Sequence, residues 1–397
     1  MQDDEELLPA QRKNDARSAT HSRTSTSQQA KRAQSRALPT QDQHPGRFET
    51  ISVDNEGTRQ SRSQDRPASK AGGKHLRASI TQEYSTQQDA AARAKVDNCV
   101  SKFAFATKTG FSPSNPYKVN QDSFLAMPHL GEYRRTHFFA VLDGHGVFGK
   151  EVSEYVKTQL GQRTEVLIKQ IFDNAKQMQR VVDSNEVKDA LASSFGFVTQ
   201  QLYAASGIDI YFSGSTCVSV LIVGNKVFCA NVGDSRAVLA RETDGSLLGF
   251  ALNRDHKGSE PDEEKRILGS GGRIEAFKDA QGRPMGPLRV WHQHENIPGL
   301  AMTRSFGDHA AAEVGVIAEP EILEMNLTEE DKFIVIASDG VWEFLTNDEV
   351  VRIVEPHYKS NSAERAAEAL IKESLKKWKS EENVIDDITC IIIFLTI

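Results

Sequence analysis

The sequence has few cysteines and no long apolar run. Its 397 residues contain four scattered cysteines: Cys99, Cys217, Cys229 and Cys390. Without a Cys-x-x-Cys pair, neither a disulfide framework nor a thiolate zinc site is expected, and buried free thiols are predicted instead. The longest apolar run, residues 390–395, has the length of a buried strand and is far too short to cross a bilayer. We therefore expect no membrane insertion.

Aliphatic and aromatic residues are scarce in the first 98 positions. This segment has nine Leu, Ile, Val or Phe residues, and its aromatic residues are Phe48 and Tyr84. Such a composition buries too little apolar surface to offset the conformational entropy of folding. We predict a disordered, low-complexity tail over residues 1–98 and one folded domain over residues 99–397. The tail is mildly basic, whereas the rest is acidic and brings the formal charge of the chain to −7.

The beginning of the sequence lacks a targeting signal. Residues 1–6 have neither the basic start nor the apolar stretch of a secretory signal, and Gln2 excludes N-terminal myristoylation. An intracellular protein, cytoplasmic, nuclear or both, is expected. The mixed charges of the tail and its lack of stacking residues argue against a nucleic-acid partner, and the acidic remainder would repel a polyanion.

Short runs rich in Val, Ile, Phe and Ala begin near residue 101 and predict strands. The clearest predicted strands are 102–107, 137–142, 217–223, 227–232, 236–240, 333–337 and 388–395. Helical periodicity or helix-start signals predict helices over 150–172, 187–202, 261–268, 347–354 and 363–377. The strands come as hairpins and the helices in groups, which favours an α+β sandwich of antiparallel sheets over a parallel doubly wound sheet.

Carboxylates stand at the ends of several predicted strands. They are Asp122, Asp143, Asp234, Asp339 and Asp386. An Asp-Gly pair alone is a common turn, so Asp143-Gly144 and Asp339-Gly340 also have a purely structural interpretation. Together, these acids describe an oxygen-rich site of the kind that Mg²⁺ or Mn²⁺ prefers, and two such ions side by side hydrolyse phosphate esters. His145 could protonate the leaving group.

Seven ordered motifs make the resemblance to a known family specific. They are Asn120-Gln121-Asp122, residues 141–146 (VLDGHG), residues 213–216 (SGST), residues 230–236 (ANVGDSR), residues 300–308 (LAMTRSFGD), residues 337–343 (ASDGVWE) and residues 386–389 (DDIT). In this order they resemble the metal-dependent serine/threonine protein phosphatases of type 2C (the PPM family) over roughly residues 100–397. The resemblance implies a four-layer αββα sandwich of two antiparallel sheets flanked by helices.

The resemblance also implies metal ligands. Asp143 matches the carboxylate that bridges two metal ions, and Gly144 matches the residue whose carbonyl binds the second. Asp339 and Asp386 match ligands of the first ion. Asp234, together with Asp339, matches a third, weaker site. The implied cofactors are therefore two Mg²⁺ or Mn²⁺ ions, with a third as an addition.

Further positions match catalytic residues of the family. Asp122 matches the acid that orients metal-bound water, and His145 matches the general acid. The family places a phosphate-gripping arginine before Asn-Gln-Asp; the nearest basic residue here is Lys118, which would act as a point charge rather than a bidentate fork. For Arg304 and Asp308, a structural ion pair is an open alternative to a role near the site.

Two segments depart from the family pattern or vary within it. The last motif reads Asp386-Asp387 where many relatives have Asp-Asn. Residues 273–299 are rich in Gly, Pro and charge, and they correspond to a flap beside the active site. His292 and His294 alternate within this segment, but polar surface is a better interpretation than a metal site.

The resemblance predicts a monomeric phosphatase that hydrolyses phosphoserine and phosphothreonine in phosphorylated protein substrates. The expected reaction is in-line attack by water activated at a binuclear Mg²⁺ or Mn²⁺ centre. The alternative is a pseudophosphatase that keeps the fold as a binding module. Retention of His145 and of every predicted metal-binding acid favours the enzyme.

Overall fold

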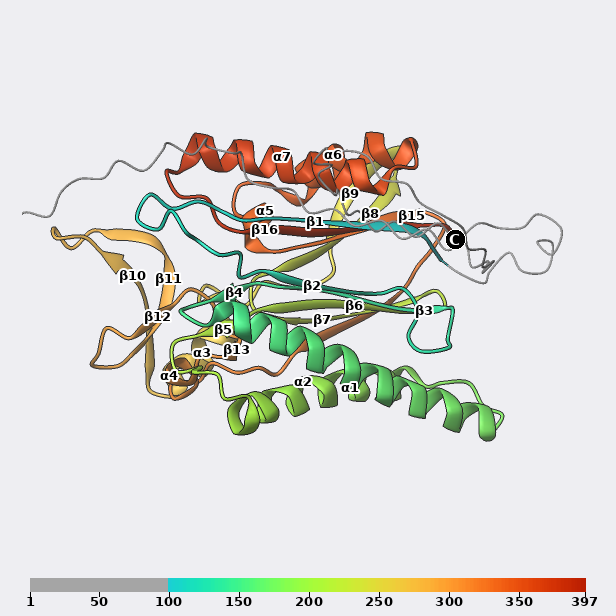
Figure 1. Cartoon of the computed structure of the whole chain (residues 1–397), viewed down its shortest axis with the longest axis horizontal. Coiled ribbons are helices and arrows are strands. Elements are labelled where there is room, and N and C mark those ends of the chain that lie inside the picture. Colours follow the sequence, from blue (N-terminus) through green and yellow to red (C-terminus); the bar gives the residue numbers. More distant parts are fainter. Residues whose placement is uncertain (1–98) are drawn as a thin grey trace, which may run out of the picture. The chain divides into compact units, whose positions relative to one another are not determined.

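The structure, a computed structural model, describes residues 99–397, so the predicted tail at residues 1–98 lies outside the described part. Two five-stranded antiparallel sheets form its centre (Figure 1). Sheet I contains, in spatial order, β1 (Val100–Lys108), β16 (Ile388–Leu395), β15 (Asp331–Ala337), β8 (Arg236–Thr243) and β9 (Ser246–Ala251). Sheet II contains β14 (Glu321–Asn326), β7 (Lys226–Val232), β6 (Cys217–Val223), β3 (Thr136–Leu142) and β2 (Ser123–Met127).

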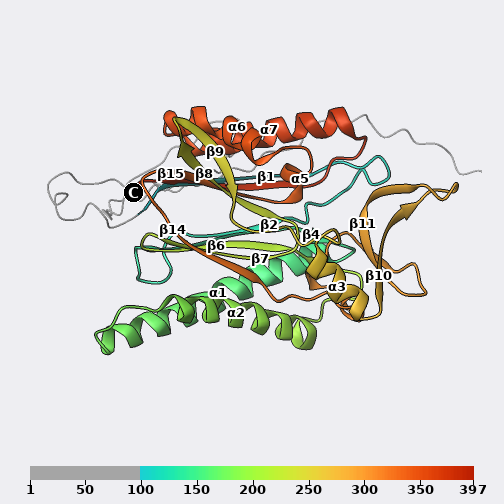
Figure 2. The same ribbon diagram turned by 180° about the vertical axis from the view of Figure 1, so that it is seen from behind.

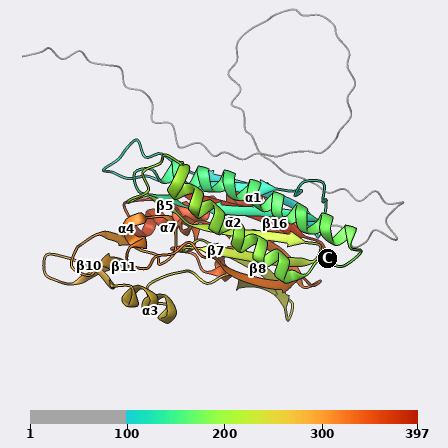
Figure 3. The same cartoon turned by 90° about the horizontal axis from the view of Figure 1, so that it is seen from below.

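Pairs of helices cover the outer faces of the two sheets. Helices α6 (Asn347–Lys359) and α7 (Ala363–Glu381) pack on sheet I, and α1 (Gly149–Gln177) and α2 (Ser184–Ala205) pack on sheet II. Figure 3 shows the α1–α2 pair from below, lying across the strands. This arrangement is the predicted four-layer αββα sandwich.

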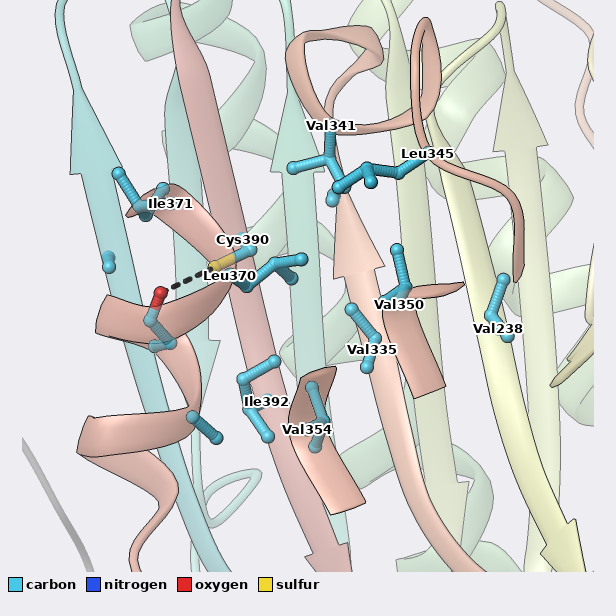
Figure 4. Packing of buried hydrophobic residues seen from close by; sticks show 14 of the residues in the cluster. Val238, Val335, Val341, Leu345, Val350, Val354, Leu370, Ile371, Cys390 and Ile392 are labelled. Carbon is cyan, nitrogen blue, oxygen red and sulfur yellow. Dashed lines mark hydrogen bonds between the residues drawn. The ribbon is translucent and has the colours of Figure 1, made fainter. Parts of the chain in front are cut away.

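Three apolar clusters hold the layers together. One joins sheet I to α6 and α7, and Figure 4 shows Val335 and Ile392 on the strands facing Val354 and Leu370 on the helices. A second joins sheet II to α1 and α2. The third lies between the sheets, where the Phe103 and Phe139 rings meet edge to face at 5.1 Å. Since β16 packs on both faces, all eight of its residues are buried, which explains its continuous apolar sequence.

Local sequence signals account for several element boundaries. Asp183 and Glu186 form a capping box at the start of α2, and Thr346 and Glu349 form one at the start of α6. Pro261 occupies the first turn of α3 (Pro261–Gly269), as predicted. The predicted hairpin turn also forms between β6 and β7, with Gly224 at a positive φ of 62°.

Smaller elements gather at one end of the sandwich (Figures 1 and 2). A three-stranded sheet contains β13 (Phe306–Gly307), β5 (Gly214–Ser215) and β4 (Gly144–His145). A second contains β10 (Gly272–Lys278), β11 (Pro284–His292) and β12 (Pro298–Leu300), and it packs with α3 and α4 (His309–Ala312). The predicted flap at 273–299 is therefore largely strand. Asp339 begins the short helix α5 (Asp339–Trp342).

Candidate metal-dependent active site

The predicted site residues come from strand ends of both sheets. Asp143 follows β3 and Asp234 lies two residues beyond β7, whereas Asp122 immediately precedes β2. Asp339 follows β15 after one residue, and Asp386 lies two residues before β16. The antiparallel topology thus brings acids that are up to 264 positions apart in the sequence to one end of the sandwich.

Asp143 and Asp339 form the centre of this group. Their side chains are half-buried and close enough for each charge to act on the other. Burial raises the pKa of Asp143 well above its usual range, and the charges of Asp339, Asp122 and Asp386 raise it further. Burial also raises the pKa of Asp339, with added repulsion from Asp234 and Asp386. Such a pair is unfavourable without a compensating positive charge.

Asp122 lies on the side of sheet II, where β2 pairs with the strand that ends just before Asp143. Its Oδ2 accepts a hydrogen bond from Ser338 Oγ at 2.8 Å. Burial and the nearby charge of Asp387 raise the pKa of Asp122 to about 7. The Ser338 hydroxyl also accepts from the Thr389 backbone N–H at 3.1 Å, so one serine links β16 to Asp122. The sequence analysis did not identify Ser338, whose only signal is its place directly before Asp339.

Unpartnered carboxylate oxygens mark the positions that a cation would fill. Among residues 99–397, the buried Oδ1 atoms of Asp122, Asp234 and Asp339 have no hydrogen-bond partner. Asp234 has a cation nearby, Lys257, whose Nζ lies 3.7 Å from its Oδ2, yet burial still leaves the Asp234 pKa raised. Buried anionic oxygens without donors are costly unless a metal ion compensates for them, and hard oxygen donors suit Mg²⁺ or Mn²⁺. The residues therefore fit the implied metal ions.

Gly144 lies where the chain leaves no space for a side chain. A Cβ at this position would approach Gly149 O to 2.2 Å and Gln121 O to 2.6 Å. Gly144 is paired with Ser215 between β4 and β5. Glycine at this position thus lets the start of α1 and the Asn-Gln-Asp loop close around the Asp143-Gly144 backbone.

His145 is half-buried and lies beside Asp308, an acid whose role the sequence analysis left open. Its Nε2 donates to Asp308 Oδ2 at 2.7 Å, and Asp308 also accepts from Ser305 Oγ at 2.5 Å. Burial lowers the pKa of His145, but the charges of Asp308 and Asp234 outweigh that effect and raise the pKa overall. The Nδ1 of His145 is buried and has no hydrogen-bond partner among the described residues.

Lys118 contacts the two acids that precede β16. Its Nζ lies 3.2 Å from Asp386 Oδ1 and 2.7 Å from Asp387 Oδ1. Burial lowers the Lys118 pKa, but these two carboxylates raise it overall. Asp387 also accepts from the backbone N–H groups of Gly110 and Gln121, at 2.7 and 2.9 Å. Asp387, the second acid of the Asp-Asp motif, therefore connects the end of the sheet to the loop before β2. Binding of the substrate phosphate by Lys118 stays a prediction.

Arg304 proves to be part of a structural ion-pair network. Its guanidinium binds both oxygens of the buried Glu263, with the shortest contact 2.7 Å. Arg266 binds the same carboxylate at 2.6 and 2.7 Å. The structural alternative is therefore correct for Arg304, whereas Asp308 contacts His145.

In residues 99–397, the acidic group whose ligand atoms have the close spacing of a metal site is not the predicted one. Oxygens of Asp262, Glu263 and Glu321 all lie within 4.8 Å of one another. Arg254 binds Asp262 and Glu321, and Arg266 and Arg304 bind the carboxylate of Glu263. Because arginines already compensate these charges, this group is better explained as an ion-pair network than as a cation site.

The remaining sequence interpretations concern the flap histidines, the cysteines and the membrane. His292 Nε2 contacts the Ala310 carbonyl oxygen at 2.6 Å, so this ring links the flap to α4. All four cysteines are free and buried, as predicted. In residues 99–397, no helix combines the length and apolar character that a membrane span requires. The intracellular location stays a prediction.

Comparisons with known proteins agree with this fold and site. The family model described as "Protein phosphatase 2C" matches residues 117–384. The probable protein phosphatase 2C 35 of Arabidopsis thaliana is 35% identical over 305 residues, which cover 73% of this chain and 83% of the relative. The probable protein phosphatase 2C 73 of the same plant is 32% identical over 299 residues, covering 72% and 78%.

A solved structure supports the fold independently. The serine-threonine phosphatase 2C from Toxoplasma gondii superimposes with a TM-score of 0.63 at 22% identity, over 74% of this chain and 95% of that one. This likeness supports the four-layer αββα fold. The chain belongs to the protein phosphatase 2C family, which confirms the prediction of a protein phosphatase.

Proposed function

We propose that the protein removes phosphate from phosphoserine and phosphothreonine in proteins, using Mg²⁺ or Mn²⁺. The observation that carries this proposal is the group of acids at one end of the sandwich, in which the buried Oδ1 atoms of Asp122, Asp234 and Asp339 have no hydrogen-bond partner among residues 99–397. The names of the similar proteins support the substrate class. The proposal takes the enzyme to act as a monomer on phosphorylated protein substrates.

The metal-holding residues are assigned from their chemistry and their burial. Asp143, Gly144, Asp339 and Asp386 would hold two ions, and Asp234 with Asp339 a third. Bound divalent ions would supply an activated water nucleophile and neutralise the phosphate oxygens. Asp122, held by Ser338, would orient the water for in-line attack on phosphorus without a phosphoenzyme.

Proton supply to the leaving alkoxide falls to His145. Asp308 holds the ring through Nε2 and favours its protonated form, so the unpartnered Nδ1 is the nitrogen placed to donate. Lys118 would contribute positive charge for the substrate phosphate beside Asp386. Thiol chemistry has no support: burial raises the pKa of Cys217 and leaves that of Cys229 at about 12, so neither offers a thiolate near neutral pH.

The decisive test is an assay of purified protein on a phosphothreonine peptide. We expect turnover with Mn²⁺, loss of turnover with a chelator, and loss in Asp339→Ala even when Mn²⁺ is present. Metal-independent turnover or full activity of the variant would contradict the mechanism. A folded protein without turnover under all conditions would instead favour the pseudophosphatase alternative.

A further inference from the structure

A second cavity opens beside the candidate active site. Its volume is about 410 Å³, and it lies between the end of β1, the start of β2 and the first turns of α1. Asp122 lines this cavity and also belongs to the acidic centre, so the cavity adjoins that centre. Three lysines, Lys108, Lys150 and Lys157, line the same cavity.

The positive charges of this cavity are only partly compensated. Glu154 forms an ion pair with Lys157 and also accepts a hydrogen bond from Ser123 Oγ at 3.1 Å. Lys150 is exposed, and within residues 99–397 its ammonium group has no carboxylate partner. Burial lowers the pKa of Lys108, and repulsion from Lys379 lowers it further. The lining contains three lysines against two acids, Asp122 and Glu154, so by count its charge is positive.

A structural role does not explain Lys150. It is the second residue of α1, where a cation is disfavoured by the helix dipole, so its charge does not stabilise the helix. Its neighbour Gly149 packs directly against Gly144, the predicted metal ligand. Lys150 thus carries an uncompensated charge one residue from the wall of the active site.

We propose that this cavity, the lysine subsite, binds a second anionic group of the substrate polypeptide. The group would be a phosphate or carboxylate side chain near the phosphorylated residue that is hydrolysed. Lysine ammonium groups bind such anions as point charges. This inference rests on the proposed function, because it assigns a substrate preference to the same centre.

The test compares two peptides of one sequence. Each contains one phosphothreonine; the first has neutral neighbours, and the second has glutamate or phosphoserine at neighbouring positions. We expect a higher kcat/KM for the acidic peptide. Lys150→Glu should reduce that preference roughly three- to tenfold, while turnover of p-nitrophenyl phosphate, which cannot reach the subsite, stays unchanged. High salt should weaken the wild-type preference because it screens the contact.

A matched control lies on the same helix. Lys176→Glu makes the same charge change at the exposed far end of α1, about 39 Å away for a 26-residue separation, and should leave the preference intact. Equal kcat/KM values for both peptides in the wild type, or an unchanged preference in Lys150→Glu, would overturn the inference. Absence of turnover for every substrate would instead be a failure of the proposed function.

Inhibition by inorganic phosphate tests whether the cavity binds a group of the substrate peptide or the released product. Inorganic phosphate should inhibit the wild type and Lys150→Glu to the same extent, because the subsite is assigned to a group carried by the peptide. If Lys150→Glu weakened phosphate inhibition and left the peptide preference unchanged, the cavity would be a site for the released product, and the proposal would be wrong.

Discussion

The Nε2 of His145 and the Oδ2 of Asp308 are hydrogen-bonded at 2.7 Å although the residues lie 163 positions apart. Asp308 adopts a left-handed backbone conformation, with φ of 46°, and its backbone N–H donates to Ser213 O at 2.9 Å. This uncommon conformation places the Asp308 carboxylate within hydrogen-bond distance of the imidazole Nε2. The pair fixes the ring orientation and leaves Nδ1 unpartnered.

Asp308→Asn should impair proton donation while leaving the metal ligands in place. General-acid catalysis contributes roughly 10²- to 10⁴-fold, so we expect a fall of about 10- to 100-fold in kcat for a phosphoserine peptide. The loss should be much smaller for an activated aryl phosphate, whose leaving group needs no proton. His145→Ala should show the same pattern more strongly.

Asp209→Asn is a suitable comparison because Asp209 is an exposed residue whose carboxylate accepts from the Tyr211 backbone N–H. It should leave both substrates unaffected. Equal losses for peptide and aryl phosphate in Asp308→Asn would show that Asp308 does not act through the general acid.

Gly214→Ala should disturb the hydrogen bond between His145 and Asp308, because the added methyl group would collide with the Asp308 carboxylate. A Cβ at Gly214 would lie 2.1 Å from Asp308 Oδ2 and 2.6 Å from Phe306 O. We expect lower kcat and a lower melting temperature. Gly196→Ala, in the interior of α2 with no atom within 4 Å of the added Cβ, should raise stability by about 0.5–1 kcal/mol. Thermal unfolding and peptide turnover distinguish the two, and unchanged turnover in Gly214→Ala would argue against the contact.

Asp339→Asn should stabilise the metal-free protein while abolishing its activity. The substitution removes one charge from a buried group of acids, and stabilising changes of this kind are worth about 0.5–2 kcal/mol. Mn²⁺ should raise the melting temperature of the wild type and have less effect on the variant. Asp189→Asn, at an exposed position of α2, should behave like the wild type. A less stable metal-free Asp339→Asn protein would contradict this account.

Glu263→Gln should destabilise the fold whether or not metal is present. Glu263 is fully buried, and Arg266 and Arg304 hold its carboxylate; burial raises its pKa, but these partners outweigh burial and bring the pKa to about 2. Removal of the charge leaves the largely buried Arg304 with only the longer contact to Glu321, at 3.3 Å, among the carboxylates of the described residues, and we expect a cost of up to about 3–5 kcal/mol. Urea unfolding with and without Mn²⁺ measures this cost. A loss that appeared only with Mn²⁺ would support a cation site at this group.

His137 should make the fold sensitive to mild acid. Its buried ring donates to the Pro128 carbonyl oxygen at 2.5 Å, and burial lowers its pKa to about 4. The unfolded chain binds a proton near pH 6.5 and the folded protein does not, so stability is lost as pH falls from about 6.5 to 4, by up to about 3 kcal/mol. His129, whose ring lies 6.1 Å away, also has a lowered pKa and adds to the effect.

His137→Gln keeps a donor but cannot titrate. Urea unfolding at pH 7, 5.5 and 4.5 should therefore show a shallower loss of stability for the variant than for the wild type. Parallel curves for the two proteins would mean that His137 does not carry the pH dependence.

The buried strands could be predicted from the sequence because their environment leaves a clear pattern. β16 and β6 appear with the predicted bounds, since both lie in the centre of a sheet and read as continuous apolar runs. The half-exposed strands β2, β9 and β14 were not predicted, because they lie at sheet edges where polar residues are tolerated. Strand β11 in the flap was not predicted either, because it contains Pro284 and Gly286, which are typical of loops.

The site was predictable in part for a related reason. Acids that follow buried strands stand out locally, but Asp143 and Asp339 each also fit a common Asp-Gly turn, so only the set of acids together indicated a site. Pairings across the fold leave no local signal: that Asp308 contacts His145, or that Glu263 holds Arg304, depends on how distant segments are brought together.

The place of β16 in sheet I has a consequence for synthesis of the chain. This strand follows all the other described elements in sequence, yet it lies between β1 and β15. On the ribosome, where segments fold as they emerge, β1 and β15 must remain without their shared neighbour until β16 leaves the exit tunnel. Asp386 emerges just ahead of that strand. Until β16 emerges, the edges of β1 and β15 that it will join stay unpaired, and unpaired strand edges are sites where other chains can pair.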